Sequence, residues 1–334
     1  MSVLGAWNDG WRRALRAPWI IIGLWVTTLL LALPPALALR GMLAEHLGAS
    51  LAAGAAVRGA NFDWWNEFLA QAAGIGQTFV PAILGFAAVM KNLSTVADAG
   101  ALPMAIASVV AAYIVLSVFL LGGVLDRLAR DHAIGSRGFF AASGAFFFRF
   151  LRLGAIAAFT YWLLFAKLHP LLLDDAFRSL TANVAVERTA FAYRVALYLV
   201  FGVVLLTVNV LFDYAKIRMV VEDRRSAIGA VVAAGRFIRR QPAAAFGLYL
   251  LNTLVFLAVL AAYFFTAPGA EGGLTASVAL LIGQIYVVLR VIVRVTFAAS
   301  QIALFQGRLA HAGYTAAPLP RWPDSPAADA ILPR

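Results

Sequence analysis

Residues 243–266 read AAAFGLYLLNTLVFLAVLAAYFFT, a run without a single charged side chain. The hydrocarbon core of a bilayer is about 30 Å thick and takes roughly 20 residues of α-helix to cross. This run therefore has the length and composition of one transmembrane helix. Five further runs have the same character, and they cover residues 18–39, 101–125, 153–173, 190–212 and 274–305.

The composition supports the same class of protein. Of the 334 residues, 63% are hydrophobic and only 13% are charged, and the mean hydropathy is +0.85. These values exclude an ordinary soluble domain and an intrinsically disordered chain. The strands of a membrane barrel alternate in hydrophobicity, and the sequence lacks such segments. We therefore predict an all-α polytopic membrane protein with six transmembrane helices.

The basic residues predict an orientation, because Lys and Arg concentrate in the cytoplasmic loops of membrane proteins. With the N-terminus inside and six spans, the cytoplasmic segments hold 18 of the 27 Lys and Arg residues. The formal charge of +11 is then a topology signal, and we expect no nucleic-acid partner. The expected location is the cytoplasmic (inner) membrane of a bacterium, with both termini in the cytoplasm.

Two segments leave alternatives open. The first run, with its preceding arginines and the small-residue site Ala36-Leu37-Ala38, resembles a signal peptide, but it is longer than a usual signal core. We interpret it as an uncleaved first span. Residues 78–90 form an apolar stretch too short to cross, which fits a re-entrant or an interfacial helix.

An Arg-x-x-Arg pair precedes the first, third and fifth spans, as Arg13/Arg16, Arg149/Arg152 and Arg236/Arg239. The second and third copies align without gaps at an offset of 87 residues, which superposes Asp126 on Asp213. One interpretation is a repeat of helix-hairpin units, each preceded by a basic amphipathic elbow helix. The alternative is that any elbow before an outgoing span needs arginines. In either case, the elbows at residues 2–16 and 225–240 are expected to lie at the interface and to contact anionic lipids.

We expect one membrane domain over residues 1–315, followed by a proline-rich cytoplasmic tail over residues 316–334. The only sizeable external region is residues 40–100. Within it, Trp64, Trp65 and Phe68 are expected to form an external aromatic surface. This surface is either an interfacial belt or the contact site of a protein partner.

Polar groups at membrane depth are functional candidates, because they are costly to bury there. Arg290 and Arg294 lie four residues apart, on one face of the sixth span. In a structural interpretation Arg294 pairs with Asp213 across two helices. In a functional interpretation both arginines bind an anionic headgroup or solute. The candidate ligand-binding residues are Arg290, Arg294, Gln284, Asn209 and Asn252.

Motifs of enzymes and metal sites are absent from the sequence. It has no Gly-x-Ser-x-Gly elbow, no phosphate loop, no His-Glu-x-x-His pair, and no cysteine. We therefore expect a non-enzymatic protein without a cofactor or a metal, which handles a lipid or an amphiphilic anion. A structural subunit of a larger complex and a small-solute transporter are the alternatives.

Residues 209–251 resemble a loose group of bacterial six-helix membrane proteins of unknown function. The resemblance rests on Asn209-Val-Leu-Phe-Asp-Tyr-Ala-Lys-Ile-Arg218, on Glu222-Asp-Arg-Arg-Ser226 and on Arg239-Arg-Gln-Pro242. That group is similar to the membrane domain attached to some glycerophosphodiester phosphodiesterases. The resemblance implies a six-helix fold with interfacial elbows, and it supplies no catalytic residues.

The predicted orientation can be tested with reporters that are active on only one side of the membrane. Reporter fusions at Met1 and at Arg334 are both expected to report the cytoplasm, because the arginine-rich segments stay on that side. Reporters on opposite sides of the bilayer would contradict the assignment.

Overall fold

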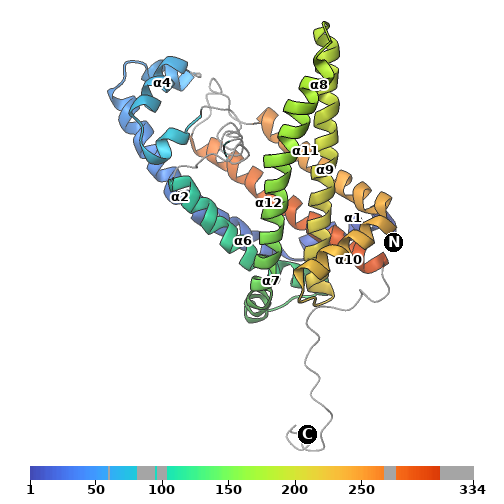
Figure 1. The fold of residues 1–334 in the computed structure, drawn as a ribbon. Helices are drawn as coiled ribbons and strands as arrows, with labels where there is room; N and C mark the ends of the chain where they lie inside the picture. The colour runs from blue at the N-terminus through green and yellow to red at the C-terminus, as the bar shows by residue number, and fades with distance from the viewer. Residues whose placement is uncertain (59–60, 81–94, 96–103, 267–275, 309–334) are drawn as a thin grey trace, which may run out of the picture.

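The computed structural model describes residues 1–58, 61–80, 95, 104–266 and 276–308, and these residues form helices and connecting turns without a β-strand (Figure 1). The stretch predicted to be re-entrant or interfacial lies mostly outside them, because only Thr78, Phe79 and Val80 are described. The proline-rich tail at residues 316–334 lies outside them entirely.

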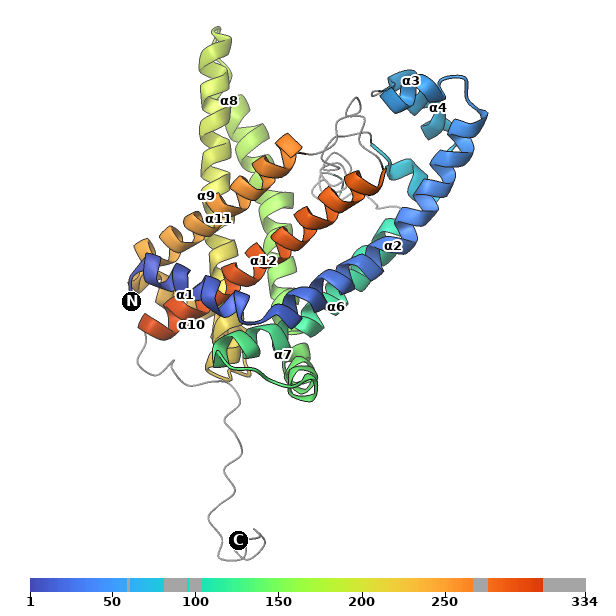
Figure 2. The same ribbon diagram turned by 180° about the vertical axis from the view of Figure 1, so that it is seen from behind.

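Six helical segments of the described chain are long and apolar enough to span a membrane, which confirms the predicted all-α fold. They are Pro18–Gly48, Ile106–Arg130, Ser136–Thr181, Glu187–Val221, Pro242–Thr266 and Ser277–Arg308. They form three antiparallel hairpins (Figures 1 and 2), built from α2 (Pro18–Ala49) with α6 (Met104–Arg130), from α7 (Ser136–Leu163) with α9 (Glu187–Val221), and from α11 (Pro242–Thr266) with α12 (Ala276–Arg308).

Two amphipathic elbow helices precede the first and third hairpins, as predicted. They are α1 (Val3–Leu15) and α10 (Ala227–Arg240), and a serine caps the N-terminus of each, Ser2 and Ser226. Pro18 and Pro242 then start the spans that follow, in the first helical position, where proline costs no hydrogen bond.

In the second hairpin the elbow and the span that follows it are not separate helices. The chain has no proline between Ser136 and Leu163, so its elbow and its outgoing span form the single helix α7. This helix continues through two π-helical stretches, η2 (Leu164–Leu168) and η3 (Leu171–Ala176), into α8 (Phe177–Thr181). The third span is therefore longer at both ends than the predicted residues 153–173.

The first span is also longer than predicted. Helix α2 passes through Pro34 and Pro35 and ends at Ala49 instead of residue 39, so the region assigned to the exterior begins within a helix. Three short helices follow it, α3 (Ala53–Arg58), α4 (Phe62–Gln71) and η1 (Gly74–Thr78).

Each elbow packs on a returning span. The first part of α7 packs on α6, α10 packs on α9, and α1 packs on α12, so the first elbow closes a ring on the last span. Gly10 permits this closure, because a Cβ atom added there would lie 2.5 Å from the Cβ of Ser300. Gly123 has the same role on α6, where its amide donates to Ser143 Oγ of α7 (3.2 Å).

The returning spans α6, α9 and α12 also contact one another. The buried side chains of these three helices gather at the end of the bundle that carries the elbows, in residues 124–129, 210–221 and 293–305. Away from this elbow end the hairpins diverge (Figures 1 and 2).

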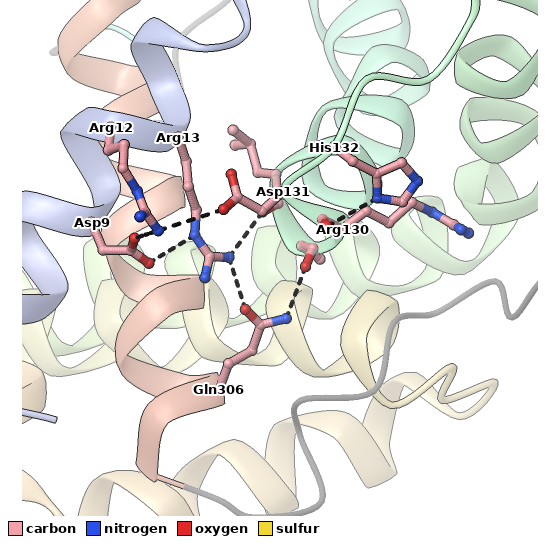
Figure 3. A network of polar contacts seen from close by, with 9 residues as sticks. Asp9, Arg12, Arg13, Arg130, Asp131, His132 and Gln306 are labelled. Atoms are coloured by element: carbon pink, nitrogen blue, oxygen red, sulfur yellow. Dashed lines mark hydrogen bonds and ion pairs between the residues drawn. The ribbon is translucent and has the colours of Figure 1, made fainter.

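A polar network fixes α1 to the ends of α6 and α12 (Figure 3). Arg13 donates to the backbone carbonyl of Leu128 (3.0 Å) and to Gln306 Oε1 (2.8 Å), and it pairs with Asp9 (2.9 Å). Gln306 in turn donates to the carbonyl of Ala129 (3.0 Å). Carbonyls of the last turn of α6, which lack partners within their own helix, are therefore bound by side chains of other helices.

The second hairpin has a comparable contact. Arg149 is the counterpart of Arg13 in the Arg-x-x-Arg pattern, and it pairs with Asp223, which follows α9. Asp131 and Asp223, which follow α6 and α9, both adopt the left-handed conformation, with φ of 52° and 48°. The contact of each arginine with the end of its own returning span supports the interpretation of the hairpins as repeated units.

We expect Arg13→Gln to lower the free energy of unfolding by about 1–3 kcal/mol, because it removes charged hydrogen bonds from nearly buried acceptors. Arg12 is a matched control on the same helix, since its side chain is 53% exposed and its ion pairs within the described chain are with Asp9 and Asp131. Arg12→Gln should cost less than about 1 kcal/mol. Unfolding in detergent micelles measures both values, and equal losses would contradict the assigned role of Arg13.

Candidate functional site

A cavity of about 600 Å³ lies between the first and third hairpins and α9. Its polar lining comes from five helices: Thr28 of α2, Tyr113 of α6, Asp213 and Lys216 of α9, Tyr249 and Thr253 of α11, and Arg290, Arg294 and Gln301 of α12. Apolar side chains line the rest, among them Leu121, Phe256 and Phe297. We call this space the central cavity.

A smaller cavity of about 360 Å³ adjoins it. The two share Leu121, Asp213, Lys216 and Tyr249 in their linings, and the smaller one adds Tyr161 and Asn209. In this smaller cavity the hydroxyl of Tyr161 donates to Asn209 Oδ1. Asn209, a predicted ligand-binding residue, is thus close to the central cavity but not in its lining.

The two arginines of the central cavity lie well away from the ends of α12. Helix α12 contacts the elbow α1 at Ser300, and an α-helix rises about 1.5 Å per residue, so Arg294 and Arg290 lie about 9 Å and about 15 Å further along the helix axis. Lys216 and Asp213 lie within α9, which continues to Val221.

Arg290 and Arg294 both line the cavity, as expected from their spacing. Nη1 of Arg294 donates to the hydroxyl of Tyr113 (2.8 Å), which connects α12 with α6. The guanidinium of Arg290 lies over the ring of Tyr286, with Cζ 5.7 Å from the ring centroid. Among the described residues, no carboxylate lies within 4 Å of either guanidinium.

The ion pair predicted between Asp213 and Arg294 is not formed between these two described residues. Asp213 pairs instead with Lys216 (2.6 Å) and accepts a hydrogen bond from Gln301 (3.3 Å). The physical reason is proximity, because Lys216 lies one turn further along the same helix. Lys216 lies beyond the predicted fourth span, which ended at residue 212, so its place in the cavity lining was not predicted.

Two other candidate residues have structural partners. Asn252 is only 2% exposed and donates to Ser300 Oγ (2.9 Å) and to the carbonyl of Leu248 (3.0 Å). Gln284 accepts a hydrogen bond from Trp25 Nε1 (2.9 Å), which connects α12 with α2. Neither residue lines the central cavity.

The residues predicted to form an external aromatic surface are mostly buried. Trp64 is 6% and Phe68 is 2% exposed, and both rings pack on His46 of α2. Trp64 Nε1 also donates to His46 Nδ1 (3.0 Å). Trp65 is half-buried and donates to the carbonyl of Phe79 (2.9 Å). The extension of α2 beyond residue 39 provides the partner that the prediction lacked.

Among the described residues, the lining of the central cavity combines three cationic side chains with one carboxylate, which leaves two positive charges in excess. A guanidinium presents a planar fork of donors that matches the oxygens of a phosphate or a carboxylate. This arrangement is chemically suited to binding an anion.

Comparisons of the chain with known protein families, with curated proteins and with solved structures returned no match. The predicted resemblance to membrane domains of glycerophosphodiester phosphodiesterases therefore stays a prediction.

Proposed function

We propose that this chain is a non-enzymatic membrane protein that binds an amphiphilic anion, such as a lipid with a phosphate or carboxylate headgroup, in the central cavity. The observation that carries the proposal is the excess of positive charge there. An arginine without a counter-ion at membrane depth costs from about 3 to more than 10 kcal/mol, depending on the method. A bound anion would offset that cost.

The mixed lining of the cavity supports an amphiphile over a small polar ion. Leu121, Phe256, Val287 and Phe297 line the cavity together with the charged groups. An apolar wall beside a cationic site suits a molecule with an acyl chain and a charged head.

We further propose that the elbow end faces the cytoplasm of a bacterial cell and that the protein lies in its inner membrane. The clustering of arginines supports this orientation, because α1, α10 and the first half of α7 carry many of them at one end of the bundle. Arg290 and Arg294 lie near the middle of α12, which runs from Ala276 to Arg308.

A structural subunit of a larger complex is the second candidate function. The observation that favours it is the exposure of large apolar side chains on the half of α9 farther from the elbows, including Phe191, Leu199 and Val203. Lipid tails or a protein partner would cover them. Small-solute transport, the third candidate, would use the same cationic cavity with a ligand that lacks an acyl chain.

Thermal unfolding of the protein in a neutral detergent, with and without a ligand, tests the proposal that the central cavity binds an amphiphilic anion. Dihexanoyl phosphatidylglycerol is the anionic probe, and dihexanoyl phosphatidylcholine is the zwitterionic control. At 100 times its Kd, a specific ligand stabilises the native state by about 2.7 kcal/mol. We expect this stabilisation for the wild-type chain with the anionic probe, and its loss in the double variant Arg290→Gln/Arg294→Gln.

Arg308→Gln is the matched control, because Arg308 lies on the same helix but outside the cavity lining. It should respond to the anionic probe as the wild type does. Asp213→Asn removes a carboxylate from the cavity lining and should strengthen the binding of the anionic probe. This variant still tests the proposal if the double variant fails to fold. Equal responses to both probes in the wild type would contradict the proposal, and stabilisation by inorganic phosphate alone would favour the small-solute alternative.

A further inference from the structure

A third cavity, of about 570 Å³, lies at the elbow end of the first hairpin. Its walls come from the junction between α1 and α2, from the last turns of α6, and from the start of α7 with the turn that precedes it. These segments lie close together in Figure 2, where α2, α6 and α7 converge. The cavity shares no lining residue with the central cavity, and we call it the elbow groove.

One end of the elbow groove carries a cation with an unused donor. Arg127 lines the groove and is only 7% exposed. Its Nη2 donates to the backbone carbonyl of Arg16 (3.1 Å), whereas its buried Nη1 has no hydrogen-bond acceptor in the described part of the chain. A buried donor without an acceptor is unfavourable, so a ligand oxygen that paired with the guanidinium would be favoured. Arg16 also lines the elbow groove.

The same end holds the N-terminus of α7. This helix has 28 residues, its N-cap is Gly135, and neither a side-chain cap nor an acidic residue in the first turn satisfies its free backbone N–H groups. The helix dipole and these donors favour a negative charge at this position. Gly135 and Ser136 both line the groove.

The rest of the groove is apolar and follows α2 for two turns. Ile20, Gly23 and Leu24 form one wall, and Leu120, Phe139 and Phe140 form the other. Trp19, at the mouth, is 81% exposed. An exposed tryptophan beside an arginine is typical of the headgroup level of a membrane. The groove thus runs from a cationic end at the interface towards the hydrocarbon region.

We propose that the elbow groove binds one anionic phospholipid from the leaflet in contact with the elbows. The phosphate would lie between the N-terminus of α7 and the guanidinium groups of Arg16 and Arg127, and an acyl chain would lie along the wall that contains Gly23. The apolar walls favour a lipid over a free phosphate ion, which would leave them unoccupied. This site is separate from the central cavity and does not depend on its function.

Native mass spectrometry of the full chain, released from detergent micelles, tests the proposal. The wild type should retain one molecule of palmitoyl-oleoyl phosphatidylglycerol at least tenfold more tightly than the corresponding phosphatidylcholine. Gly23→Leu should weaken this binding at least tenfold, because the new side chain would occupy the groove. The variant should fold, since a Cβ atom added at Gly23 meets no atom within 4 Å.

Gly41→Leu is the matched control on the same helix, because an added Cβ atom there also meets no atom within 4 Å and Gly41 does not line the elbow groove. It should bind the lipid as the wild type does, and Arg127→Gln should bind it more weakly. The double variant at Arg290 and Arg294 should keep this site, which separates it from the central cavity. Equal affinities of the Gly23→Leu and Gly41→Leu variants for the lipid would overturn the proposal. It would also be overturned if inorganic phosphate competed with the lipid equally well in the wild type and in Gly23→Leu.

Discussion

A guanidinium group cannot lie in hydrocarbon without a partner, and the placement of the arginines in this protein follows from that constraint. At the elbow end, arginines bind helix ends and acidic side chains, as Arg13 binds the carbonyl of Leu128 and Arg149 pairs with Asp223. Arg290 and Arg294 are different, because they lie far along α12 from the elbow end and face a cavity whose described lining contains one negative charge, that of Asp213. These two residues are therefore the strongest reason to assign the central cavity a ligand.

The ring of elbows explains why such a cavity can exist. Each elbow holds a returning span at one end of the bundle, and α1 closes the ring on α12 through the close approach of Gly10 to Ser300. Because the tight packing is concentrated at that end, the hairpins can diverge beyond it without separating (Figure 2). A bundle packed tightly along its whole length would leave no room for the cavity, and an unclamped bundle would not hold Lys216 of α9 near Arg294 of α12.

The amino-acid sequence predicts the spans well, because run length and the absence of charge are local properties. It also predicts the elbows at α1 and α10, whose serine caps and following prolines are local signals. It misses Lys216 and Tyr113 in the cavity, since the face that a residue presents depends on how α9 and α6 pack against α12. The wrong pairing of Asp213 has the same origin, and the burial of Trp64 depends on the unexpected length of α2.

The positive potential and the water accessibility of the cavity between the hairpins can be measured directly, because the chain contains no cysteine that would react in the background. Thr253→Cys introduces a thiol into the lining of the cavity, and Leu254→Cys introduces one at a neighbouring exposed position outside it. Methanethiosulfonate reagents of equal size, one with a sulfonate and one with a trimethylammonium group, report the local potential. We expect the sulfonate reagent to modify Thr253→Cys several-fold faster than the ammonium reagent, and this preference to disappear when Arg290→Gln and Arg294→Gln are added. A thiol at position 253 that reacts with neither reagent, or equally with both, would contradict the account.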